Sequence, residues 1–163
     1  MIGGDALWST ELFDPLTGTF PPGPAMDDSR VSHKATLLDD GRVLVTGGFN
    51  GYCYEFDAVS GSSPRFDAQV FDPLTGSWSW GGWLTVATWP YAFTATLLSN
   101  GSVLLAGDSS TSAQRFDPTT NSMLLTPQMD QPRLNHRATV LLDGRVLITG
   151  GAMNKSAEIY AAQ

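Results

Sequence analysis

Short runs of mostly apolar residues recur along this chain, and each pair of runs is separated by a tight turn. In the clearest copy, residues 136–151 (HRATVLLDGRVLITGG), Asp143-Gly144 separates two runs of four to five residues. Asp-Gly between such runs is a strong hairpin signal, and it predicts a type I′ turn with positive φ at both central residues. Two further copies, with their turns, are 33–48 (Asp40-Gly41) and 93–108 (Asn100-Gly101).

A second pattern follows each hairpin. It is a short strand that ends in an aromatic residue and Asp, then a Pro/Gly/Asn turn, then another short strand. The copies are 11–20, 68–78, 113–123 and the shorter 157–160. No window shows a sustained helical period. Together the two patterns predict a repeat of four strands over about 45 residues, which is the period of a β-propeller blade.

The order of these signals resembles the kelch family. A Met-x-x-x-Arg-x-x-His lead-in before the hairpin also fits that family, and so does the Gly-Gly that ends the second strand. The lead-in is found twice, at Met26, Arg30 and His33 and at Met129, Arg133 and His136. In detail the chain looks like the bacterial kelch repeats related to the propeller of galactose-oxidase-like proteins. The resemblance implies a propeller in which the first strand of each blade is innermost.

The strand count predicts an incomplete ring. As one unit over 1–163, the chain supplies a partial blade at 1–20, full blades at 33–80 and 93–125, and a partial blade at 136–160. That is about three and a half blades, whereas propellers typically close with four to eight. The fold class is therefore all-β, with kelch-type four-stranded antiparallel blades. We expect the ring to be closed by a homodimer, or the chain to be part of a larger propeller.

Charge and cysteine content narrow the partners. The net charge of −7 argues against nucleic acid and anionic membranes. The single cysteine, Cys53, excludes an internal disulfide and a cysteine-rich metal site. No apolar run approaches the ~20 residues of a membrane span, and the first residues do not read as a signal peptide. These features leave the cellular compartment undetermined.

The long loops favour one face of the predicted propeller. Neighbouring strands of a blade run in opposite directions. The turns between strands one and two and between strands three and four therefore lie on one face, here called the turn face. The loops between strands two and three, and from strand four to the next blade, lie on the opposite face, here called the loop face. Two loop-face segments, 49–66 and 80–92, are rich in Tyr and Trp. Such loops carry function more often than tight turns do. The aromatics predict a platform for a sugar or a peptide, with packing beneath the loop or at a subunit junction as the alternative.

The candidate ligand-binding residues are Tyr52, Tyr54, Trp80, Trp83, Trp89, Tyr91, Arg30 and Arg133. Arg30 and Arg133 recur in the repeat, so binding carbonyls or carboxylates between blades is the main expectation for them and ligand contact is the second. His33, His136 and Trp78 are expected to be structural, and the repeated Asp residues to form turns. No catalytic residues, metal ligands or cofactor are predicted, and copper bound beside Cys53 is disfavoured.

Three functions remain open from the sequence. The first is a non-enzymatic kelch propeller that recognises a protein or carbohydrate through its loop face. The second is the propeller of an enzyme of galactose-oxidase or sialic-acid-epimerase type. The third is a purely structural, self-assembling half-propeller.

Overall fold

The computed structural model describes residues 2–4, 7–50, 63–85, 92–107, 109–151 and 155–161. Every regular element in these ranges is a β-strand. The same residues include no helix long and apolar enough to cross a membrane.

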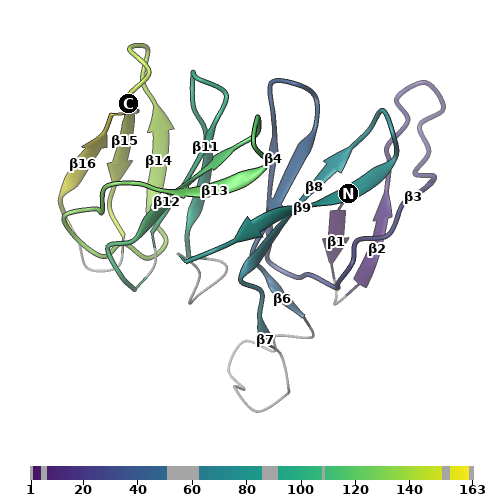
Figure 1. The fold of residues 1–163 in the computed structure, drawn as a ribbon, viewed down its shortest axis with the longest axis horizontal. Helices are drawn as coiled ribbons and strands as arrows, with labels where there is room; N and C mark the ends of the chain where they lie inside the picture. The colour runs from purple at the N-terminus through teal and green to yellow at the C-terminus, as the bar shows by residue number, and fades with distance from the viewer. Residues whose placement is uncertain are drawn as a thin grey trace.

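Four antiparallel sheets stand next to one another in chain order, as the blades of a β-propeller do (Figure 1). Blade 1 is β1 (Ile2–Gly4), β2 (Leu7–Glu11) and β3 (Pro22–Gly23). Blade 2 is β4 (Lys34–Leu37), β5 (Val43–Thr46), β8 (Asp67–Asp72) and β9 (Ser77–Trp83). Blade 3 is β10 (Thr94–Leu97), β11 (Val103–Ala106), β12 (Ala113–Asp117) and β13 (Ser122–Leu125). Blade 4 is β14 (Arg137–Val140), β15 (Val146–Thr149) and β16 (Ala157–Tyr160).

The predicted all-β fold with partial propeller blades is confirmed, and these sheets have three, four, four and three strands. The last strand of blade 1, β3, lies beyond the range 1–20 given to that blade from the sequence. The two partial blades lie at opposite ends of the molecule (Figure 1). One further element was not predicted. β6 (Phe49–Asn50) and β7 (Ser63–Pro64) pair as a small sheet at the base of the long connection between β5 and β8.

The turns between the first two strands of each blade are not of the predicted type I′. Leu38 donates its N–H to Arg42 at 2.8 Å, and Gly41 donates to Leu38 at 3.0 Å. This is a three-residue loop, a type I turn followed by one left-handed residue. The left-handed residues are Gly41, Gly101 and Gly144. The type I′ prediction is wrong because this loop needs positive φ at the glycine alone. The preceding Asp40 instead accepts the N–H of Arg42 with its carboxylate, at 3.0 Å.

The predicted role of the repeated Asp residues in the three–four turns is confirmed. In blade 2, the carboxylate of Asp72 accepts the N–H of Leu74 at 2.8 Å, and its carbonyl accepts the N–H of Gly76 at 2.9 Å. Gly76 is left-handed with φ of 65°, and Asn121 takes that conformation at φ 53° in blade 3. Asp14 and Asp117 make the same bond to the residue two positions on. Hydrogen bonds from Leu16 and Thr17 lower the pKa of Asp14.

The core lies between the blades. Each middle strand presents alternate residues to its two neighbouring blades. From blade 3, one set packs against blade 2 and the other against blade 4. The set that packs against blade 2 is Val103, Leu105 and Phe116. The set that packs against blade 4 is Leu104, Ala106 and Ala113. The first strands also touch in succession, because β10 contacts β4 on one side and β14 on the other.

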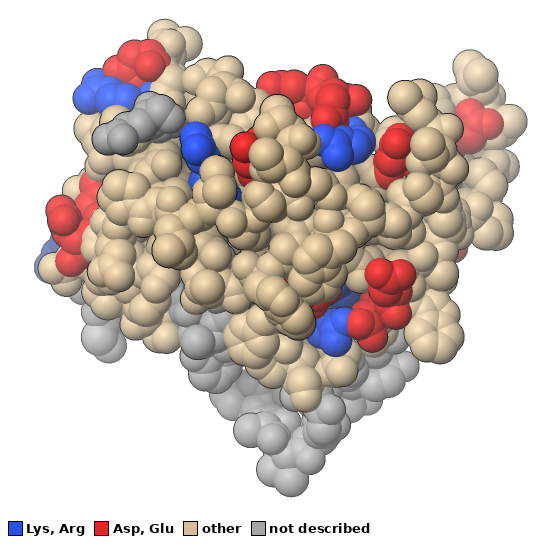
Figure 2. All heavy atoms as spheres, in the orientation of Figure 1, with Lys and Arg blue, Asp and Glu red and all other residues tan. Residues whose placement is uncertain are grey.

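Charged side chains lie mainly towards the edges of the face shown in Figure 2, and uncharged side chains cover most of its middle. Lysines and arginines do not gather into one basic patch on this face. Several of them are paired with Asp or Glu, including Arg42 with Asp40 and Arg145 with Asp143.

Candidate ligand-binding site

Two of the predicted ligand-binding aromatics come together on β9. Tyr52, Tyr54, Trp89 and Tyr91 lie outside the described residues. Trp80 and Trp83 are 48% and 67% exposed. Their rings meet edge to face, with centroids 5.0 Å apart and an interplanar angle of 74°. A β-strand carries this exposed aromatic pair at the outer side of blade 2.

A β-bulge makes the pair possible. Residues three apart on a regular strand point to opposite faces. In β9, however, Trp80 lies opposite Gln69 and Trp83 opposite Asp67, so both indoles stand on one face. The register shifts between them, at Gly81-Gly82. Gly82 has φ of 103°, a left-handed backbone that favours glycine. Two glycines therefore determine how the two tryptophans are displayed.

The tryptophan pair borders an open hollow of about 310 Å³ at the junction of blades 1 and 2. The residues that line this tryptophan hollow are Asp27, Asp28, Pro64, Arg65, Phe66, Asp67, Gln69, Trp80 and Trp83. They come from the connection after blade 1, the start of β8 and the end of β9. Five of these residues are polar or charged and four are apolar or aromatic, and a hollow of this size can admit a small ligand or a side chain.

Ion pairs fix the polar wall of the hollow. Arg65 pairs with the Asp28 carboxylate, and its Nε lies 3.4 Å from Asp67 Oδ1. Asp67 is also the ion-pair partner of the buried Arg30. Because both arginines hold it, the Asp67 carboxylate is nearly buried and well oriented. The hollow therefore combines aromatic faces with preorganised charged groups, and its three carboxylates outnumber its single lining guanidinium.

Arg30 is not available to a ligand in this structure. Its side chain is fully buried, and Nη1 donates to the carbonyls of Gly47 at 2.9 Å and Asp67 at 3.1 Å. These bonds join the lead-in of blade 2 to the connection between its second and third strands. The arginine thus holds one blade's own loops together, rather than bridging two blades as predicted.

Arg133 repeats this arrangement in blade 4. Its buried Nη1 donates to the carbonyls of Gly150 at 2.5 Å and Ser156 at 2.9 Å, and its Nε donates to Glu158 at 2.7 Å. Burial alone would raise the pKa of Glu158, but hydrogen bonds from the Asp130 backbone and from Arg133 lower it overall. Both candidate arginines are therefore structural, the role that the sequence favoured for them.

His136 is also structural, as predicted. It is 3% exposed, with Nδ1 3.2 Å from the carbonyl of Arg133 and Nε2 2.9 Å from the hydroxyl of Thr94 in blade 3. Desolvation lowers the pKa of His136. A neutral ring that donates from Nδ1 to the carbonyl and accepts at Nε2 from the hydroxyl satisfies both contacts. The ring lies over Gly107, where a Cβ would come within 2.1 Å of its Cε1.

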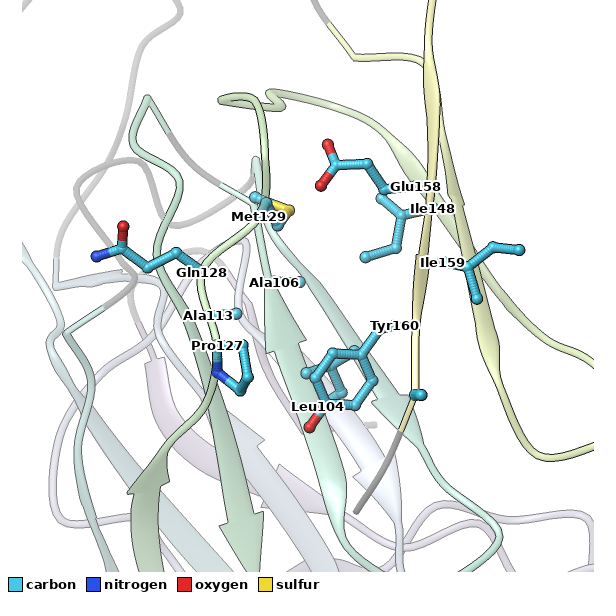
Figure 3. Close-up of a pocket in the computed structure, with 11 residues that line it drawn as sticks. Leu104, Ala106, Ala113, Pro127, Gln128, Met129, Ile148, Glu158, Ile159 and Tyr160 are labelled. Atoms are coloured by element: carbon cyan, nitrogen blue, oxygen red, sulfur yellow. The ribbon is translucent and has the colours of Figure 1, made fainter.

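A second, smaller pocket of about 140 Å³ lies between blades 3 and 4 (Figure 3). Leu104, Ala106 and Ala113 form one wall, and Ile148 and Tyr160 form the other. The same side chains belong to the apolar core between these blades. We therefore interpret this pocket as a gap in blade packing rather than as the site.

The polar half of the tryptophan hollow was missed by sequence reasoning. Arg65 and Phe66 fall within the predicted loop 49–66, but only the tyrosines of that loop were proposed as ligand contacts. Asp28 lies in the lead-in to blade 2, where the repeat pattern drew attention to Arg30 instead. A usable signal was Pro64-Arg65-Phe66 directly before β8, since the other repeats have no such residues directly before their third strand.

No metal centre accompanies this site in the part of the chain that the structure describes. Among those residues, no three of His, Cys, Asp or Glu are grouped so as to hold an ion. Cys53, beside which copper was considered, lies outside them.

Comparison with solved structures supports the fold. The structure of YjhT, a β-propeller protein, matches with a TM-score of 0.66 and 12% sequence identity. The match covers 91% of this chain and 52% of that one, so this chain spans about half the length of YjhT. No family model matches the chain. At this identity the likeness shows the fold alone: the chain consists of β-propeller blades that do not complete a ring by themselves.

Proposed function

We propose that this chain is a non-enzymatic, kelch-type propeller module that binds a carbohydrate or a protein through the tryptophan hollow. The observation that carries the proposal is the Trp80–Trp83 pair, two exposed indoles held on one face by a glycine bulge. Exposing two such large apolar rings is unfavourable unless a partner covers them. The adjoining carboxylates and guanidinium supply oriented hydrogen bonds of the kind that fix a bound ligand.

A neutral carbohydrate is the favoured ligand. The apolar face of a sugar ring stacks on an indole, and its hydroxyl groups can bond to Asp27, Asp28 and Arg65. The excess of carboxylates over guanidinium groups in the lining disfavours an anionic ligand. A peptide side chain inserted between the indoles is the alternative within the same proposal.

The test is a glycan and peptide array, followed by titration of each hit while tryptophan fluorescence is recorded. Trp83→Ala is expected to weaken binding at least tenfold, since exposed aromatic anchors of this kind carry about 1.4 kcal/mol or more. Trp8→Ala is the matched control, because Trp8 is 64% exposed but does not line the hollow. Blank arrays, or equal losses in the two variants, contradict the proposal.

An enzyme of galactose-oxidase or sialic-acid-epimerase type is the alternative that the sequence left open. Metal analysis of the purified protein separates the two functions. Stoichiometric copper would favour oxidase chemistry and count against a simple binding module.

A further inference from the structure

The junction of blades 2 and 3 shows how neighbouring blades of this chain pack on each other. The third strand of a blade places an aromatic residue towards the preceding blade. In blade 3 this residue is Phe116, which is fully buried and packs in one cluster with Leu44 and Val70 of blade 2. The latter two residues lie opposite each other on β5 and β8, on the side that faces the next blade. At this junction one aromatic residue of a blade therefore packs on two aliphatic residues of the preceding blade, and this contact is here called the unit.

The junction of blades 3 and 4 repeats this unit with different residues. Tyr160 takes the place of Phe116, and it packs with Leu104 of blade 3, while Arg115 holds the position that Val70 has in blade 2. Figure 3 shows that Glu158 and Tyr160 point from β16 towards blade 3, whereas Ile159 points the other way. The outer side of blade 4 thus has a separate surface of its own.

Blade 1 carries the aromatic half of another such contact. Phe13 holds the position of Phe71 and Phe116, but it is 56% exposed. Its ring lies 5.0 Å from that of Phe20, and the equivalent Phe71–Trp78 pair in blade 2 is separated by 5.1 Å. Blade 1 therefore presents, already formed, the surface with which the other blades pack on a preceding blade.

Blade 4 carries the aliphatic half. Leu147 and Ile159 lie opposite each other on β15 and β16, in the positions of Leu44 and Val70. Ile159 is 53% exposed, whereas Val70 is 1% exposed because blade 3 covers it. The two ends of the chain are thus complementary to each other, and they lie at opposite ends of the molecule (Figure 1).

We propose that these two ends bind each other between two copies of this chain, head to tail. In this interface Phe13 of one copy packs on Leu147 and Ile159 of the other, as Phe116 packs on Leu44 and Val70. A second copy is the favoured occupant because one chain holds both halves of the unit. The chain also spans about half the length of YjhT, so two copies supply roughly one propeller of that length. Formed twice, the interface closes a two-fold ring.

The first test is the mass in solution, measured by light scattering on the whole chain. We expect about twice the 17.5 kDa of one chain at micromolar concentration. Phe13→Asp and Ile159→Asp each place a charge at the centre of the contact and are expected to weaken self-association at least ~100-fold. Leu74→Asp is the control, because Leu74 is 93% exposed on a turn of blade 2 and should leave the mass unchanged.

Mixing the two variants tests the head-to-tail geometry. Each variant alone lacks one half of every contact, but Phe13→Asp retains Ile159 and Ile159→Asp retains Phe13. An equimolar mixture is therefore expected to regain a two-chain species through one intact contact. Phe20→Asp and Leu147→Asp form a second pair on the same surfaces, for use if a first variant fails to fold. A folded wild-type monomer, or a mixture that stays monomeric, overturns the proposal. None of these residues lines the tryptophan hollow, so ligand binding can fail or succeed separately.

Discussion

Phe116 and Phe13 occupy the same position in two repeats of one chain, yet the first is fully buried and the second is mostly exposed. Both precede Asp-Pro in the repeat. Phe116 pairs with Met123 of β13, and the ring of Phe13 lies 5.0 Å from that of Phe20. The difference is that blade 2 covers Phe116, whereas none of the four blades, as far as the structure describes them, covers Phe13. In a repeat protein the local sequence thus determines the strand, and the neighbouring repeat determines what the strand contributes to stability.

The largest expected effect comes from truncating the two phenylalanines. Phe116→Ala should lower the free energy of unfolding by about 3–5 kcal/mol, because it opens a cavity between blades 2 and 3. Phe13→Ala should cost about 1 kcal/mol or less at low protein concentration, since its ring is already hydrated. Urea unfolding measures both. Equal losses at a concentration where the chain is monomeric would show that the end of blade 1 is covered after all.

The second contrast is between a buried and an exposed arginine–aspartate ion pair. Arg30→Met should cost about 3–5 kcal/mol, because it leaves the nearly buried carboxylate of Asp67 without its buried partner. Arg145→Met is the exposed counterpart. Its pair with Asp143 lies half in solvent, so we expect little or no change in Tm. Thermal unfolding of both variants provides the measurement, and similar shifts in Tm would contradict the structural role assigned to Arg30.

The third contrast is the cost of adding a methyl group at a packed glycine and at an open one. Gly82→Ala adds a methyl group 3.1 Å from the Met123 side chain at a residue with φ of 103°, and it should cost about 2 kcal/mol. Gly18→Ala meets no atom within 4 Å, so only its left-handed backbone resists, and about 1 kcal/mol is expected. Gly82→Ala should also weaken ligand binding, since it disturbs the bulge between the tryptophans. If a folded Gly82→Ala protein keeps its ligand affinity, the bulge is not needed for ligand binding.

The smallest effect is a dependence of stability on pH through His136. Burial lowers its pKa in the folded chain, so the unfolded chain binds the proton more readily. The contribution of His136 is therefore complete above the pKa of an unfolded histidine, about 6.5. It is lost as the pH falls from there through the lower folded pKa.

The check is Tm recorded between pH 8 and pH 5 for the wild type and for His136→Gln. The wild type should lose more stability over this range than the variant, which has no ring to protonate at the junction of blades 3 and 4. Parallel curves would mean that the ring is charged or solvated in the folded protein.

The blades could be predicted from the sequence because the signals for their strands and turns are local. Alternating apolar residues, Asp-Gly turns and Asp-Pro turns each act within about ten residues, so the strand order and the two partial blades could be predicted. The turn type was missed, because Asp-Gly is compatible with both a two-residue and a three-residue loop. Only the hydrogen bond from Leu38 to Arg42 distinguishes them.

The candidate site was harder to predict because it depends on register. Trp80 and Trp83 were proposed as ligand contacts, but strict alternation along the strand would put them on opposite faces. They share a face because β9 has one extra residue opposite β8. Arg65 and Asp28 meet because the lead-in to blade 2 lies beside the segment before β8, and no spacing in the sequence records that contact.

The bulge at Gly81-Gly82 also has a consequence for how binding could diversify. Removing one of these two residues would leave the indoles two positions apart on a regular strand, still on the same side of β9 but without the local bend of the bulge. A single-codon deletion would thus change the spacing and angle of the pair without altering either aromatic. The breadth of ligands open to such a chain is therefore governed by the backbone between its tryptophans as much as by the tryptophans themselves.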